Sequence, residues 1–113
     1  MAFQLLGQAL DIMTKSFRVA HIHEQGQDII IVPRVGLVMA TLTNESLEEM
    51  RLAFQLVASE AELKGIVCLV WEVAQVFHFA APLPWHPFFR SIDMSFVVAH
   101  LNRTLTISYE ETP

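Results

Sequence analysis

The sequence predicts an α+β fold: a mixed, mostly antiparallel sheet of five or six strands, with one long amphipathic helix on one face. Two observations support this prediction. Residues 43–64 repeat apolar side chains at three- and four-residue spacing, and the continuous apolar run 66–71 follows directly. Such a run belongs inside a sheet that is covered on both sides. The 113 residues are enough for one domain, so we treat 1–113 as a single unit.

The helix over residues 43–64 has recognisable ends. Thr43, Asn44 and Ser46 can accept hydrogen bonds from the first free N–H groups, and Ser46 with Glu49 has the spacing of a capping box. Gly65 is expected to end the helix in the left-handed conformation. The apolar stripe consists of Leu47, Met50, Phe54, Val57, Ala58 and Ala61.

The first third of the chain changes period. Residues 2–13 fit a short N-terminal helix, although an extended conformation also fits them. From Ser16 the period is two, which predicts a strand through His23, a turn at 24–27 and a returning strand over 28–32. Proline cannot donate to a ladder, so the second strand should end at Pro33.

The segments around the long helix suggest a crossover unit. Residues 35–42 are expected to be a third extended piece that leads into the helix, and 66–71 is the strand that follows it. If the strands on either side of the helix are parallel, the connection should be right-handed.

The last 40 residues combine irregular and alternating segments. Residues 73–79 could continue a strand after a bend, and three prolines within 82–87 exclude a regular ladder. The last of these prolines can begin a short helix over 87–92. Residues 95–101 and 104–109 alternate, which predicts a terminal hairpin.

Composition narrows the class of partner. The chain is 53% hydrophobic and 17% charged, with a net charge of −5, and its seven basic residues are scattered. This argues against nucleic acid as a partner, because a phosphate footprint needs clustered Lys and Arg. No apolar run approaches the length of about 20 residues that spans a bilayer, and no signal-peptide pattern opens the chain. We therefore expect a cytoplasmic, bacterial-type protein that does not act on membranes.

Sequence signals for chemistry are few. There is no phosphate-binding glycine loop, zinc-protease motif or nucleophile elbow. Cys68 is the only cysteine and lies within an apolar run, which predicts a buried, inert thiol.

His21 and His23 project from one face of a strand and could bind a metal with Glu24, His78 or His100 as a third ligand. We expect no cofactor and no metal, and keep as the alternative a small enzyme that uses this histidine cluster, with or without a metal ion.

The aromatic segment 77–89, with Trp71, is the main candidate binding site. Large rings with a few polar anchors are the usual lining of a small-molecule pocket, whereas the competing explanation is that they only close one end of the sheet. The prolines should hold Trp85 at the surface or at the mouth of a pocket. The candidate ligand-binding residues are Trp71, Phe77, His78, Phe79, Trp85, His86, Phe88 and Phe89.

These observations favour a homodimeric, non-enzymatic module that binds an apolar small molecule or a protein partner. The small share of charged residues leaves apolar surface that a monomer seldom exposes. A two-fold contact in residues 73–101 or the N-terminal segment would cover it.

Overall fold

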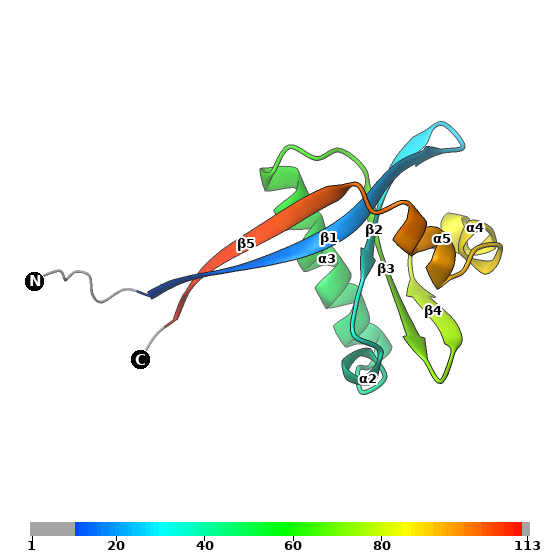
Figure 1. Ribbon diagram of the computed structural model, residues 1–113, viewed down its shortest axis with the longest axis horizontal. Helices are drawn as coiled ribbons and strands as arrows, with labels where there is room; N and C mark the ends of the chain where they lie inside the picture. The colour runs from blue at the N-terminus through cyan, green and yellow to red at the C-terminus, as the bar shows by residue number, and fades with distance from the viewer. Residues whose placement is uncertain (1–10, 112–113) are drawn as a thin grey trace, which may run out of the picture.

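A computed structural model describes the backbone of residues 11–111 and the side chains of residues 14–107 (Figure 1). It contains a five-stranded sheet in the order β4-β3-β2-β1-β5, in which only β2 and β3 are parallel. The strands are β1 (Asp11–Glu24), β2 (Gln27–Pro33), β3 (Ile66–Val73), β4 (Val76–Ala80) and β5 (Arg103–Glu111). The helices are α2 (Gly36–Met39), α3 (Asn44–Glu60), α4 (His86–Arg90) and α5 (Met94–Ala99), with a 3-10 turn η1 (Leu83–Trp85). The α+β class, the mixed sheet and the long helix are confirmed.

The β1–β2 hairpin forms as predicted, but β1 begins earlier than expected. Its two central turn residues, Gln25 and Gly26, have φ angles of 54° and 76°. Two left-handed residues in a two-residue loop make the turn whose twist matches the strands beside it. Most of the predicted helix over 2–13 lies outside the described residues, and its described end, 11–13, belongs to β1.

The crossover is present, because β2 and β3 pair in parallel on either side of α3. The predicted strand over 35–42 is wrong, since this segment contains α2, a single helical turn. Strand β2 already fills the place beside β3, and Arg34 N–H donates to the Val70 carbonyl at 2.8 Å. The chain then turns away from the sheet instead of adding a further strand.

Helix α3 begins where the sequence indicates and ends earlier. The Thr43 hydroxyl accepts a hydrogen bond from Ser46 N–H at 3.1 Å, so Thr43 caps the helix. The C-terminal stop is Glu62, not Gly65: Glu62 has a φ of 59°, and Leu63 N–H donates to the Ala58 carbonyl at 2.9 Å. This is the bonding pattern of a Schellman stop with a glutamate in the left-handed position.

The terminal hairpin predicted over 95–101 and 104–109 is also wrong. The Asp93 carboxylate accepts from Phe96 N–H at 2.9 Å and caps α5, which takes up most of the first half. The second half is β5, which pairs antiparallel with β1 at the sheet edge, from Val19–Arg103 to Asp11–Glu111. Figure 1 shows these two strands projecting together as a long ribbon.

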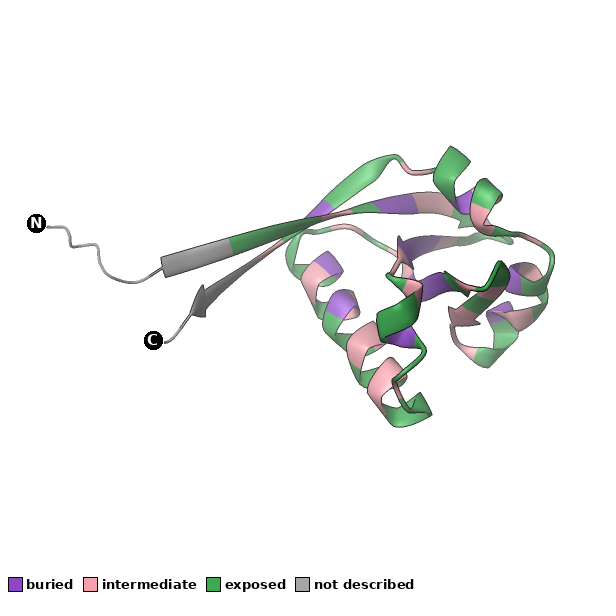
Figure 2. Cartoon of the chain, turned by 60° about the horizontal axis from the view of Figure 1, so that its bottom comes forward, coloured by how far each residue is buried: buried purple, intermediate pink, exposed green. Residues whose placement is uncertain are grey.

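The sheet is covered on both faces, and each face has its own core (Figure 2). On one face α3 packs over Val19, Ile30, Val32, Val67, Leu69, Trp71 and Leu105. On the other, α4 and α5 cover Ala20, Ile29, Ile31, Cys68 and Val70. Alternate residues of β2 and β3 therefore enter opposite cores, which explains why both strands are apolar without interruption.

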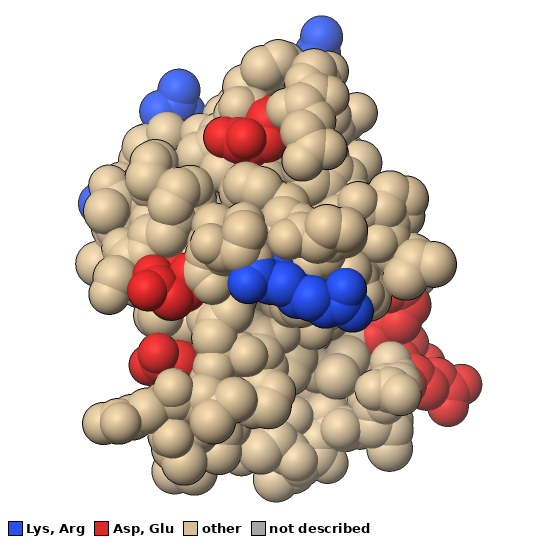
Figure 3. Space-filling view, turned by 90° about the vertical axis from the view of Figure 1, so that its right-hand side faces the viewer, with Lys and Arg blue, Asp and Glu red and all other residues tan. Residues whose placement is uncertain are grey.

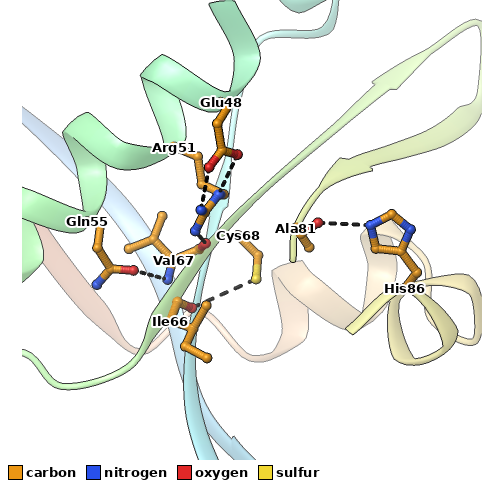
Figure 4. A network of polar contacts seen from close by, with 8 residues as sticks. All are labelled: Glu48, Arg51, Gln55, Ile66, Val67, Cys68, Ala81 and His86. Carbon is orange, nitrogen blue, oxygen red and sulfur yellow. Dashed lines mark hydrogen bonds and ion pairs between the residues drawn. The ribbon is translucent and has the colours of Figure 1, made fainter. Parts of the chain in front are cut away.

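Two α3 side chains complete the exposed edge of β3 (Figure 4). Strand β4 pairs with β3 only from Leu69 onward. Before that point, the Gln55 amide donates to the Gly65 carbonyl at 2.8 Å and accepts from Val67 N–H at 2.9 Å. Arg51 donates to the Val67 carbonyl at 3.2 Å and is held by Glu48 at 2.6 Å. These side chains replace the missing strand.

Candidate functional site

The structure divides the predicted aromatic site between the two faces of the sheet. Trp71 belongs to the core under α3, and the His78 ring stacks on it with centroids 5.8 Å apart. Phe77 and Phe79, next to His78 along β4, face the other core. Side chains alternate along a strand, so one segment cannot present neighbouring residues to one pocket.

The remaining rings form a packed cluster under α4. Phe89 is fully buried and stacks on Phe79 at 5.4 Å, while Phe88 meets Phe89 edge-on at 5.2 Å. Trp85 meets Phe88 edge-on at 5.9 Å and is only 7% exposed, so the expectation of a surface position for Trp85 is wrong. The prolines exclude a ladder here, but they permit the 3-10 turn that directs Trp85 inward.

His86 is tied to the chain beside this cluster. Its Nε2 lies 2.8 Å from the Ala81 carbonyl oxygen, and its ring meets Phe79 edge-on at 5.0 Å. A ring nitrogen beside a carbonyl carries the proton and donates it. The contact fixes the entry into α4, as Figure 4 shows.

The histidines of the alternative hypothesis have separate partners. His21 Nε2 donates to the Lys64 carbonyl at 2.7 Å, and His23 Nδ1 lies 2.6 Å from Asp28 Oδ1. The bond from His23 lowers the pKa of the exposed Asp28 carboxyl below its ordinary value. Each imidazole is thus engaged at a different point along β1.

The proposed third ligands do not join His21 and His23. His78 lies on β4, three strand positions away from β1, which corresponds to about 14 Å. His100 donates to the Phe96 carbonyl at 2.7 Å and stacks on that ring at 4.1 Å. Within residues 14–107, no three His, Cys, Asp or Glu side chains gather as a set of metal ligands.

Cys68 is buried as predicted. Cys68 is 0% exposed in the core under α4 and α5, and burial raises the pKa of its thiol to about 12. A thiol with this pKa is almost entirely protonated at neutral pH, so it is a poor nucleophile.

An apolar surface that the sequence did not predict surrounds α2. Val35, Leu37 and Val38, in and beside α2, are 66%, 78% and 54% exposed, and Val76, the first residue of β4, is 55% exposed. We call these four residues the α2 patch. Solvent-facing apolar side chains gathered on one turn of helix are typical of a contact surface.

A close backbone approach fixes α2 against the sheet. A Cβ on Gly36 would overlap the carbonyl oxygen of Glu72 in β3. Only glycine allows the two backbones to lie this close. At the other end of the turn, Met39 is 2% exposed and enters the core under α3. The α2 patch is therefore held on a rigid base.

A hollow lies on each side of α2, and both are lined by Met39. The Arg34 hollow has a volume of about 490 Å³ and is lined by Lys15, Ser16, Phe17, Pro33, Arg34, Val35, Val38 and Met39. The Trp71 hollow has a volume of about 350 Å³ and is lined by Met39, Ala40, Leu42, Leu47, Trp71, Val73 and His78. Two members of the predicted site, Trp71 and His78, thus belong to a real concavity.

Charged groups are few on the side of the molecule that Figure 3 presents. Figure 3 shows isolated Lys, Arg, Asp and Glu groups across the middle of one side and an uncharged area below them. No helix in the described part of the chain is long and apolar enough to cross a bilayer.

Comparison with known protein families, with curated proteins and with solved structures finds no match.

Proposed function

We propose that this protein is a non-enzymatic, self-associating interaction module whose contact surface is the α2 patch. The observation that carries the proposal is the exposure of Leu37 and Val38 on the single turn α2 and of Val35, the residue that precedes it. A protein surface gains free energy by covering such side chains, at about 25 cal/mol for each Å² of apolar area removed from water.

A second copy of the chain is the occupant that the patch suits best. A two-fold contact places every group beside its own copy, so charges near the axis repel each other. The α2 patch contains four aliphatic residues and no charge. A standard interface covers about 800 Å² on each partner and has an apolar centre with a polar rim. The patch supplies the centre, and the rims of the two hollows extend it.

The test is the oligomeric state, measured by sedimentation over a range of protein concentrations. Leu37→Ser removes the most exposed member of the patch twice in each dimer, and we expect the dissociation constant to rise at least tenfold. Leu37→Arg should have a larger effect, because two like charges would meet at the axis. The matched control is Leu56→Ser, on the outer side of α3, where Leu56 is 61% exposed.

Two outcomes would contradict the proposal. One is a wild-type protein that remains monomeric at high micromolar concentration. The other is a dimer that dissociates equally in the Leu37 variants and in Leu56→Ser, since the association would then not depend on α2.

A second candidate function is the binding of an apolar small molecule in the Trp71 hollow. It rests on the Trp71–His78 stack beside an apolar concavity of about 350 Å³, a size within the range of ligand sites. Toluene can be titrated into a Trp85→Phe variant, in which Trp71 is the remaining tryptophan. We expect a saturable shift of the Trp71 emission that is lost when Leu47→Phe, a larger side chain without indole fluorescence, is added to fill the hollow. An unchanged emission would contradict this candidate.

A further inference from the structure

Arg34 is a cation without an acidic partner in the described part of the chain. Ion pairs among those residues join His23 to Asp28 and Arg51 to Glu48, and neither involves Arg34. Its Nε atom is buried and has no hydrogen-bond partner. Buried donors are nearly always satisfied, so an unsatisfied guanidinium nitrogen requires an explanation.

Two aromatic rings hold the guanidinium in place. Its central carbon lies 5.0 Å from the Phe17 ring centroid and 5.1 Å from that of Phe54. The two rings meet edge-on at 5.2 Å, so they form a fixed corner. Stacking on the ring faces stabilises the cation but satisfies none of its N–H groups. The N–H groups of the planar Arg34 guanidinium therefore remain without acceptors, in a fixed orientation. Two such N–H groups side by side match the two oxygens of a carboxylate.

A second cation shares the Phe17 ring. Lys15 Nζ lies 5.7 Å from its centroid, and both Lys15 and Arg34 line the Arg34 hollow. The described lining contains no Asp or Glu, and its other polar side chain is the hydroxyl of Ser16. Two cations thus face one concavity of about 490 Å³ on a chain whose net charge is −5.

The rest of the lining is apolar. Phe17, Pro33, Val35, Val38 and Met39 form the remaining walls. An inorganic anion gains no binding free energy from such walls. An aliphatic or aromatic group attached to the anion does, because its apolar surface is removed from water. Small-molecule sites combine these elements: a mostly apolar cavity with a few polar groups that fix one end of the ligand.

From these contacts we infer that the Arg34 hollow is a binding site for a small organic monocarboxylate. The carboxylate pairs with Arg34 and is supported by Lys15, and the apolar body of the ligand lies against Val35, Val38 and Met39. All residues of this site come from one chain, and two of them, Val35 and Val38, also belong to the α2 patch.

The test uses hexanoate as the probe, followed by calorimetry and by amide chemical shifts of the intact protein. We expect saturable binding with shifts around Phe17 and Val35. Arg34→Met keeps the aliphatic contact with the rings and should weaken binding at least tenfold. Arg34→Lys keeps the charge but loses the fork, so we expect a smaller loss. The matched control is Lys64→Met, which removes one positive charge from an exposed position outside this hollow.

Further titrations separate the chemical classes of ligand. 1-Hexanol has the same chain without the charge and should bind at least tenfold more weakly than hexanoate. Inorganic phosphate at matched ionic strength should bind more weakly as well. If hexanol equals hexanoate, the hollow is only apolar, and if phosphate equals it, the site is not selective for carboxylates. Either result overturns the inference, as does unchanged hexanoate binding in Arg34→Met.

The same titration in Leu37→Ser distinguishes this inference from the proposed self-association. Leu37 does not line the Arg34 hollow. Val35 and Val38 belong to both the patch and the hollow, but Leu37→Ser changes no residue of the hollow, so hexanoate binding should persist in this variant. Loss of binding in Leu37→Ser, with binding retained in Arg34→Met, would show that the probe occupies the α2 patch and would overturn the assignment.

Discussion

Gln55 should stabilise the fold far more than its position on a helix surface suggests. Its amide makes two hydrogen bonds to the edge of β3, of 2.8 Å to the Gly65 carbonyl and 2.9 Å to Val67 N–H. Both lie in partly buried surroundings, before the first residue that β4 pairs with. Gln55→Ala leaves both backbone groups without their protein partner.

The magnitude follows from the number of groups left unpaired. An unsatisfied buried group costs about 1–3 kcal/mol, and partial access of water favours the lower end, so two groups cost about 2 kcal/mol. The better helix propensity of alanine returns a few tenths of a kcal/mol. With a urea dependence of about 1–3 kcal/mol per M, the unfolding midpoint should fall by about 1 M.

The assay combines urea unfolding with amide hydrogen exchange. Glu49→Ala is the control, because Glu49 is exposed on the same helix and makes no such contact. Gln55→Glu keeps the acceptor for Val67 N–H and loses the donor to Gly65, so its cost should lie between wild type and alanine. The reasoning is refuted if Gln55→Ala unfolds at the same midpoint as Glu49→Ala, or if the Val67 amide exchanges no faster.

Three further predictions concern single positions. Cys68, with a thiol pKa of about 12, should react slowly with a thiol reagent in the native protein and quickly after denaturation; rapid native labelling contradicts its burial. Glu62→Gly should raise the unfolding free energy by about 0.5–1 kcal/mol, because φ is positive there; an unchanged melting temperature contradicts this. Asp28, whose pKa His23 lowers, should stabilise the fold above its ordinary pKa of 3.8 and lose this contribution as pH falls through the lowered pKa. Wild type should therefore lose more stability on acidification than Asp28→Asn, and parallel pH profiles contradict it.

The sequence predicted the elements whose pattern depends on local periodicity. Helix α3 and strands β2 and β3 were predictable, because their apolar residues report directly which face is buried. The hairpin turn at Gln25–Gly26 was also predictable from its glycine. Residues 95–101 were not, since short apolar segments fit either period and only the cap at Asp93 favours a helix.

The candidate site was harder to predict for a geometric reason. Trp71 and His78 share a hollow, while Phe77 and Phe79 enter the opposite core. The alternation of side chains along β4 predicts that His78 lies on the face opposite to Phe77 and Phe79. Only the pairing of β4 with β3 shows which of these two faces is covered by α3. Nothing in the sequence identifies Arg34 as a binding residue, because the two rings that contact it belong to β1 and α3, which are distant from it in the chain.

The pairing of β1 with β5 has a consequence for the order of folding. Ser16 and Thr106, whose hydroxyls lie 3.2 Å apart on these strands, are 90 residues apart in the sequence. The β1–β2 and β3–β4 hairpins close over a few residues, whereas loop closure across most of the chain is slow. During synthesis β1 is made well before its outer partner β5, so β1 keeps an open edge until β5 has left the ribosome. A chain that stops before Arg103 would keep that edge open permanently and would expose it to pairing with other chains.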